Sequence, residues 1–194
     1  TRMINSGNAP ATTVIDYGTI ASAGDFTDFG DLTVARGGHG ATANPTRCVF
    51  GGGTSYKNVI DYIEIATTGN AADFGDLSAG KDYFSANASS TRGVFGGGRV
   101  PGAAETAGID YIEIASTGNA IDYGDITTAN QQLAGTDNSV IGLYGGGQQP
   151  AETNVIQQFI ISNGGTCTDF GDLTQARRQL LGNSNAHGGL NAGI

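Results

Sequence analysis

The chain has 194 residues and a formal net charge of −9, with only nine basic residues. So few cations cannot build the positive face that nucleic acids and anionic membranes require, so we expect no nucleic-acid partner and no membrane insertion. Glycine is abundant at 33 residues, but only four prolines accompany it and no G-X-Y period is present, which excludes collagen. Hydrophobic residues make up 38% of the chain, enough for the core of a single domain over residues 1–194. Because the chain begins at Thr1 rather than at methionine, we expect processing or a longer parent protein.

Three sequence markers recur along the chain. A block of the form Asp-aromatic-Gly-Asp-aliphatic-Ser/Thr occurs four times, at successive spacings of 45, 49 and 47 residues. An aromatic residue followed by three glycines occurs three times, and an Ile-Asp-Tyr marker occurs three times with a looser fourth copy. The chain is therefore a tandem array of four units. The blocks begin at Asp28, Asp73, Asp122 and Asp169, the glycine runs follow Phe50, Phe95 and Tyr144, and the third marker contains Ile15, Ile60, Ile109 and Ile156.

Each unit reads as four short strands, because apolar runs of four to six residues are bounded by turn-forming residues. In the second unit we expect strand A over His39 to Ala43, strand B over Arg47 to Phe50, strand C over Ile60 to Ala66 and strand D over Asp73 to Leu77. Only Thr174 to Leu181 suggests a helix, and it is homologous to strand-forming copies. Four strands per unit of this length predict an all-β propeller with one blade per unit.

The second unit carries the clearest family likeness. Arg47 to Gly53, followed by Ile60 to Ile65, resembles the kelch motif, and all four units follow the same pattern. The tandem FGGG and DFGDL blocks resemble the kelch-like repeat proteins of marine tailed phages, cyanophages especially. That resemblance implies a four-bladed kelch-like propeller in a tail or other virion appendage.

The two ends of the chain match different parts of one unit. Thr1 to Gly7 aligns with strand B, and Ala176 to Asn185 aligns with strand A. Pairing of these segments would complete one blade and close the ring, hiding its edge strands. The alternative is an open arc, completed by further repeats or by another chain.

Repeated side chains are expected to hold the units together. We expect the repeated aromatic residues to be largely buried between blades, and the recurring arginines to contact carboxylates between or within blades. The aromatic set is Phe29, Phe74, Tyr123 and Phe170 with Phe50, Phe95 and Tyr144, and the arginines are Arg36, Arg47, Arg92 and Arg177.

No catalytic constellation emerges from the sequence. The Asp blocks occur in every unit, as a structural turn requires and a unique catalytic centre does not, and their glycine suits a bulge; calcium near these loops is the alternative left open. The glycine runs lack a following Gly-Lys-Ser/Thr and favour close packing over phosphate binding. His39 and His187 have no ligand partners at suitable spacing, and Cys48 and Cys167 are expected to be buried free thiols. We therefore expect no enzyme, no metal and no cofactor.

The loops between strands B and C differ in every unit. They cover Asn8 to Thr13, Thr54 to Asn58, Arg99 to Gly108 and Gln148 to Asn154. In an up-and-down blade these loops emerge on one face, where variable chemistry sits on a rigid scaffold. The turns between strands C and D hardly vary and are expected to be structural. The predicted binding residues are Tyr56, Lys57, Arg99, Val100, Gln148 and Gln149.

Two functions follow as hypotheses. The first is a virion structural module that binds other virion proteins or a host-surface glycan or protein, with homo-oligomer formation left open. The second is a free-standing extracellular propeller that binds carbohydrate or protein. A third, an enzyme with a site in the propeller channel, is disfavoured by the sequence.

Overall fold

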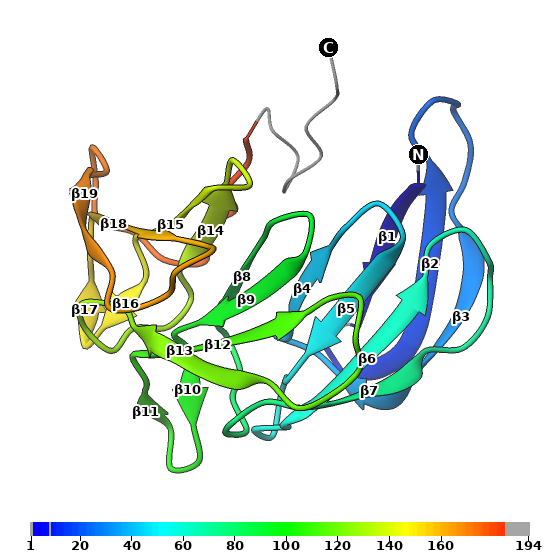
Figure 1. The fold of residues 1–194 in the computed structure, drawn as a ribbon, viewed down its shortest axis with the longest axis horizontal. Helices are drawn as coiled ribbons and strands as arrows, with labels where there is room; N and C mark the ends of the chain where they lie inside the picture. The colour runs from blue at the N-terminus through cyan, green and yellow to red at the C-terminus, as the bar shows by residue number, and fades with distance from the viewer. Residues whose placement is uncertain (1, 8, 185–194) are drawn as a thin grey trace.

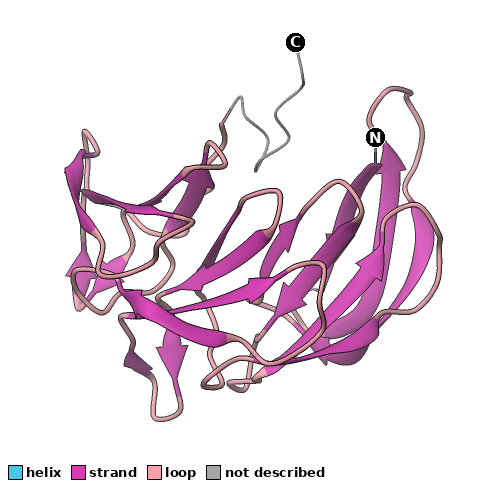
Figure 2. Cartoon of the chain, in the orientation of Figure 1, coloured by secondary structure: helices cyan, strands magenta, loops and turns pink. Residues whose placement is uncertain are grey.

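The computed structural model describes residues 2–7 and 9–184, and these form an all-β protein. Figure 2 shows strands joined by loops throughout this part of the chain. Thr174 to Leu181, the one segment with a helix-like pattern, forms neither a helix nor a strand, and its residues are bends and irregular backbone. The described residues also contain no helix long and apolar enough to cross a membrane.

The strands form four antiparallel sheets that follow one another along the chain. The first sheet has the order β1-β2-β3, the second β4-β5-β6-β7, the third β13-β12-β9-β8 and the fourth β14-β15-β18-β19. Two hairpins, β10-β11 and β16-β17, extend from the third and fourth sheets. The strands are β1 (Arg2–Ser6), β2 (Thr12–Thr19), β3 (Thr27–Arg36), β4 (Gly40–Ala43), β5 (Arg47–Gly51), β6 (Val59–Glu64), β7 (Ala72–Asp76), β8 (Ser85–Ala88), β9 (Arg92–Gly96), β10 (Arg99–Val100), β11 (Ala104–Glu105), β12 (Gly108–Glu113), β13 (Ile121–Asp125), β14 (Ala134–Asp137), β15 (Ile141–Gly145), β16 (Gln148–Gln149), β17 (Ala151–Glu152), β18 (Val155–Ile160) and β19 (Thr168–Asp172).

The sheets stand side by side as a fan (Figure 1). Strands β4, β8 and β14 contact one another along its inner side, while the last strand of each sheet lies outermost. The first and fourth sheets lie at opposite ends, and the fan is open between them. Ring closure through the terminal segments is therefore not present. Residues 176–184 form no strand beside β1, and Asn185 lies outside the described residues.

The hydrophobic core is divided into three clusters, one between each pair of neighbouring sheets. Ile15 and Phe29 of the first sheet meet Phe50 of the second, and equivalent clusters follow along the fan. Most of the predicted aromatic core is confirmed: Phe29, Phe50, Phe74, Phe95 and Tyr144 are each at most 2% exposed.

Two of the predicted core aromatics differ from their repeats. Tyr123 is only half-buried. The prediction was wrong for Phe170, which is 54% exposed because it lies on the outer side of the last sheet, where no further sheet covers it.

The glycine of each Asp block lies at a bulge. The register of strand C against strand D shifts beside Gly30, Gly75, Gly124 and Gly171 in the four sheets. A Cβ atom on Gly30 would lie 2.4 Å from the carbonyl oxygen of Gly69, in the C–D turn of the next sheet. The same turn donates its Gly69 N–H to the Phe29 carbonyl at 2.8 Å. The C–D turns therefore join neighbouring sheets, which explains why their sequence hardly varies.

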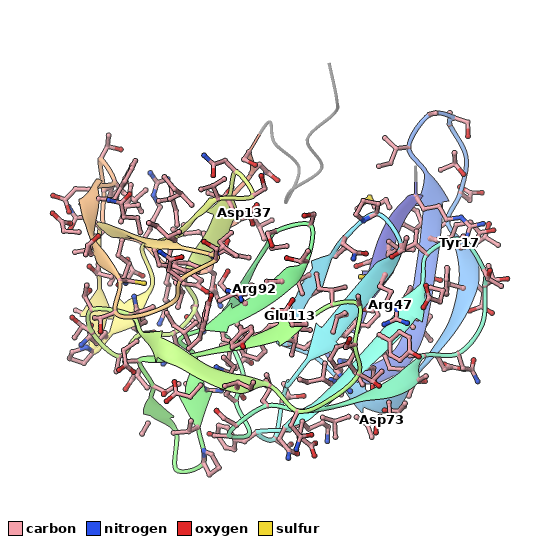
Figure 3. The ribbon with its side chains drawn as sticks, viewed as in Figure 1. Tyr17, Arg47, Asp73, Arg92, Glu113 and Asp137 are labelled. Atoms are coloured by element: carbon pink, nitrogen blue, oxygen red, sulfur yellow. The ribbon has the colours of Figure 1, made fainter. Side chains whose placement is uncertain are left out.

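Arginine side chains at the start of β5 and β9, the strand ends away from the B–C loops, join neighbouring sheets; both residues are labelled in Figure 3. Arg47 forms an ion pair with Glu64 at 2.7 Å in its own sheet and donates to the Ile114 and Ala115 carbonyls of the next. Arg92 repeats this arrangement with Glu113 at 2.9 Å, a hydrogen bond that raises the pKa of Arg92. The predicted arginine–carboxylate contacts are thus confirmed for these two arginines.

Two buried ion pairs lie nearer the inner strands. Arg36 and Asp61 are both 0% exposed, with 2.7 Å between Nη2 and Oδ2, and Lys81 Nζ lies 2.8 Å from Asp110 Oδ2. Burial lowers the pKa of both cations, and the neighbouring carboxylate opposes that shift. Arg36 thus follows the prediction, whereas Arg177 is exposed and has no ion-pair partner among residues 2–7 and 9–184.

A candidate binding surface at the loop end

The B–C loops lie at one end of the fan, which we call the loop end. Hairpins β10-β11 and β16-β17 are the longest of these loops, and in Figure 1 the first projects at the lower edge and the second lies at the left side. Their backbones are fixed to the neighbouring connections: Arg99 exchanges both backbone hydrogen bonds with Asp82, and Gln148 does so with Gln131. The variable chemistry therefore sits on an ordered base.

Tyr56 and Arg99, predicted from separate loops, come together at the loop end. The Arg99 guanidinium lies 6.0 Å from the Tyr56 ring centroid and 4.5 Å from that of Tyr83. It also binds Asp82 through two hydrogen bonds, of 3.0 and 3.2 Å, which raise the pKa of Arg99. Two aromatic faces and a fixed cation form a patch suited to a polar ligand with an apolar face. We call Tyr56, Asp82, Tyr83 and Arg99 the aromatic patch.

The predicted amides form a second, separate group. Gln148 accepts a hydrogen bond from Arg178 through Oε1 and donates to the Pro150 carbonyl at 3.2 Å. Arg178 in turn lies 3.5 Å from Glu152 of the same hairpin. Lys57, Val100 and Gln149 are half-buried in their loops. The structure thus brings Tyr56 and Arg99 together, and keeps Gln148 in a separate group with Arg178.

A row of residues at the centre of the loop end was not predicted from the sequence. Tyr83, Gln132 and Gln179 occupy the same place in successive units, with φ values of +53°, +57° and +56°. Their N–H groups donate in turn to the carbonyls of Gly38, Tyr83 and Gln132, at 2.8 to 2.9 Å. Such φ values are uncommon for residues other than glycine. The only sequence signal for these residues is that each lies two positions after Arg36 or its counterpart in another unit. The residue type at that position differs from unit to unit, so the repeat comparison did not find it.

These residues line a shallow cavity of about 300 Å³ that also touches His39 and Leu133. Tyr83 belongs both to this cavity and to the aromatic patch, so the two form one continuous surface. A tyrosine ring bordered by glutamine amides can stack on a sugar ring or a peptide side chain and hydrogen-bond to its polar groups.

A second cavity, of about 670 Å³, lies between β1 and β4 and contains a serine–histidine contact. Ser6 Oγ lies 3.0 Å from His39 Nε2, a contact that the sequence reasoning missed because the two residues are 33 positions apart. Burial and the charge of Arg36 lower the pKa of His39 to about 4. His39 Nδ1 has no hydrogen-bond partner among the described residues, so the carboxylate that orients the histidine of a catalytic triad is missing there.

The cysteines and the Asp blocks make contacts that stabilise the fold. Cys48 and Cys167 are buried and unpaired, and burial raises the pKa of each thiol to about 12. Within residues 2–7 and 9–184, no three His, Cys, Asp or Glu side chains gather as metal ligands would. Asp31 accepts from Thr13 at 2.7 Å, and its backbone N–H donates to Asn70 of the next sheet at 3.1 Å.

Comparison with known proteins identifies no relative of this chain: no protein-family model matches it, and no curated protein does. Its function must therefore be argued from its own residues.

Proposed function

We propose that the four sheets are the blades of a kelch-like β-propeller architecture and that the chain is a non-enzymatic structural module of a virion appendage. Four sequence units with matching sheets support the architecture, as does the kelch-like order of markers along each unit. The likeness of the tandem blocks to phage repeat proteins supports the location in a tail or fibre.

The observation that carries this role is that the two ends of the fan differ, one being conserved between units and the other variable. Turns and arginines that repeat from unit to unit join the sheets at one end, whereas unequal loops surround the aromatic patch and central cavity at the other. A rigid scaffold with one variable end is suited to assembly with other virion proteins or to attachment at a host surface.

Two measurements test the virion role. Tail and capsid genes should flank the coding sequence, and mass spectrometry of purified particles should detect the chain at a fixed ratio to tail proteins. Flanking genes of unrelated function, together with absence from purified particles, would contradict the proposal.

A free-standing extracellular propeller that binds carbohydrate is the second candidate, and the tyrosine and glutamine lining of the central cavity favours it. A glycan array probed with the purified chain tests the ligand class for both candidates. Tyr56→Ala in the aromatic patch, combined with Gln179→Asn in the cavity lining, should reduce binding at least about tenfold; asparagine tolerates the positive φ of position 179. The control is Thr117→Ala in a C–D turn at the opposite end, which should leave binding unchanged. Arg99→Ala is less suitable, because it would leave the buried Asp82 carboxylate without its cation.

A further inference from the structure

Each of the three inter-sheet interfaces contains a polar link at the same repeat positions. In the first two, a hydroxyl side chain and a cation three residues later both bind one buried aspartate on strand C of the next sheet: Thr33 and Arg36 bind Asp61, and Ser78 and Lys81 bind Asp110. In the third, the Thr127 N–H donates to the buried Gln157 side chain, and Asn130 donates to the Gly146 carbonyl, as Arg36 also does to the equivalent Gly52 carbonyl.

The two ends of the fan hold the halves of a fourth link. Thr174 and Arg177 follow the last strand, and Asp16 occupies the strand C position of the first sheet. Arg177 is exposed, whereas Arg36, Lys81 and Asn130 are at most 3% exposed. Neither Arg177 nor Asp16 forms an ion pair within the described residues. Arg177 and Asp16 have opposite charges, as do the pairs at the first two interfaces, although the third interface has amides at these positions.

Apolar residues are exposed at the same two surfaces. Phe170 on the fourth sheet is 54% exposed, whereas its counterpart Phe74 is 2% exposed. Ile20 on the first sheet is 65% exposed, whereas Ile114 is fully buried against the preceding sheet. Both residues are exposed only because their sheets end the fan. Burying such side chains would favour association.

The inner strands show the same complementarity. The first sheet lacks the inner strand that the other three have, and the 670 Å³ cavity borders β1 where that strand would lie. The segment Leu181–Ser184 has the sequence position of an inner strand, and it already packs against β14. A Cβ on Gly182 would lie 2.6 Å from the Gly135 carbonyl oxygen, as one on Gly135 would lie 2.8 Å from that of Ala86. The fourth sheet thus carries, beside β14, a segment at the inner-strand position of a further sheet.

We propose that a second copy of this chain supplies those strands. The first sheet of the second copy would pack on the fourth sheet of the first copy, with Leu181–Ser184 pairing to its β1 and Arg177 and Thr174 binding its Asp16. The chain's own first sheet does not fill this place, because it lies at the other end of the fan (Figure 1). Two copies that make this contact reciprocally form one closed ring, in which each end surface is covered. The inference rests on the repeats and not on the proposed virion role.

The Asp block of the fourth unit supports this contact independently. Cβ atoms on Gly30, Gly75 and Gly124 would each lie 2.4 Å from a carbonyl oxygen of the next sheet's C–D turn. Gly171 keeps the same backbone shape, with φ of +145°, but nothing lies within 4 Å of its Cβ position. Gly24 of the second copy holds the turn position that would approach it.

Light scattering after size exclusion tests the proposal on the full chain. The wild type should have twice the 19.6 kDa mass of one chain. Asp16→Arg and Arg177→Asp should each weaken dimer formation at least about tenfold, and an equimolar mixture of the two variants should restore it. Gly171→Ala should weaken it as well. Lys57→Glu, a charge reversal at the loop end, is the control and should leave the dimer intact, and circular dichroism should show that every variant is folded.

A cysteine pair distinguishes a second copy from closure within one chain. In the double variant Asp16→Cys and Thr174→Cys, oxidation should give a covalent dimer on a non-reducing gel, because the thiols meet across two chains. A disulfide within a single chain would overturn the proposal. A wild-type chain that is monomeric at every concentration, or a dimer that survives Asp16→Arg, would also overturn it.

Discussion

Individual residues show how the same link can be built with or without charge. Lys81 and Asp110 are each 3% exposed, so removing one charge leaves the other buried and uncompensated. The equivalent Asn130 and Gln157 are neutral and equally well buried. At the third interface the chain therefore places neutral side chains at both of these positions, with Asn130 bound to the Gly146 carbonyl and Gln157 bound to the Thr127 N–H.

This pair of links gives the first prediction. Lys81→Asn alone should lower the free energy of unfolding by about 3–5 kcal/mol, since the Asp110 carboxylate loses its cation. Adding Asp110→Gln should restore most of that loss, because it removes the uncompensated buried charge and leaves the same neutral pair of residues that the next interface has. Urea denaturation of the two variants measures both effects. A double variant as unstable as the single one would show that the neutral link depends on its own surroundings.

His39 gives a prediction of pH dependence. Its pKa of about 4 in the folded chain lies below the ordinary 6.5, so the unfolded chain binds the proton more tightly. His39 therefore costs no stability above about pH 6.5, and the folded state loses stability as the pH falls from there towards 4. The loss should reach roughly 3 kcal/mol.

Urea denaturation of the wild type and His39→Gln across this pH range isolates the contribution of His39. The difference in stability between the two proteins should be constant above about pH 7 and shift in favour of the variant as the pH falls. A difference that does not change with pH would mean that His39 accepts its proton in the folded state as easily as in the unfolded one.

The sequence predicted residue roles well where another sheet follows in the array, apart from the half-buried Tyr123. Phe29 and Phe74 are buried as expected, and Arg36 has the carboxylate partner that its recurrence indicated. Phe170 and Arg177 carry the same sequence signal and differ only because the next sheet is missing. A pattern in one chain cannot show whether a neighbour is present, so these errors all fall at the end of the array.

At the scale of elements, the repeated glycine connects the bulge of one sheet to the turn of the next. Gly75 and Gly171 have nearly the same φ, +144° and +145°, so alanine strains the backbone equally at both positions. They differ in that a Cβ on Gly75 would meet the Gly118 carbonyl at 2.4 Å.

This matched pair of glycines gives a prediction. In dilute, monomeric protein, Gly75→Ala should cost about 1–3 kcal/mol more than Gly171→Ala, because only Gly75 has an overpacked neighbour. Thermal unfolding of the two variants under identical conditions gives the comparison. Equal losses would assign the glycine requirement to the backbone conformation alone.

Strand positions in the second unit follow the sequence closely: the four strands lie within one or two residues of their expected bounds. The hairpins β10-β11 and β16-β17 were not anticipated, because strands of two residues are too short to show an alternating pattern. The candidate site was predicted only as a loop surface. The Arg99–Tyr83 contact depends on tertiary packing between a loop and a neighbouring connection, which loop sequence alone does not encode.

At the scale of the whole molecule, stability is divided among sheet-to-sheet interfaces. In such arrays each unit contacts only its neighbours, so units with two neighbours are held more firmly than units with one. The second and third sheets each contribute to two hydrophobic clusters, whereas the first sheet and the fourth sheet each contribute to only one. The first and fourth sheets should therefore unfold locally more readily than the second and third.

Hydrogen exchange measures this gradient of stability. In the Asp16→Arg variant, which we expect to be monomeric, amides of β9 and β12 should exchange most slowly, and those of β1 and β19 most rapidly. In the wild type at high concentration, contact with a second copy should slow exchange in β1 and β19 while leaving β9 and β12 almost unchanged, because only the end sheets gain a neighbour. The gradient in the monomer depends on the interfaces within one chain, and its reduction in the wild type depends on the contact between copies. Uniform exchange in the variant would show that the fan unfolds as one cooperative unit, whereas a gradient that persists in the wild type would show that its ends stay uncovered.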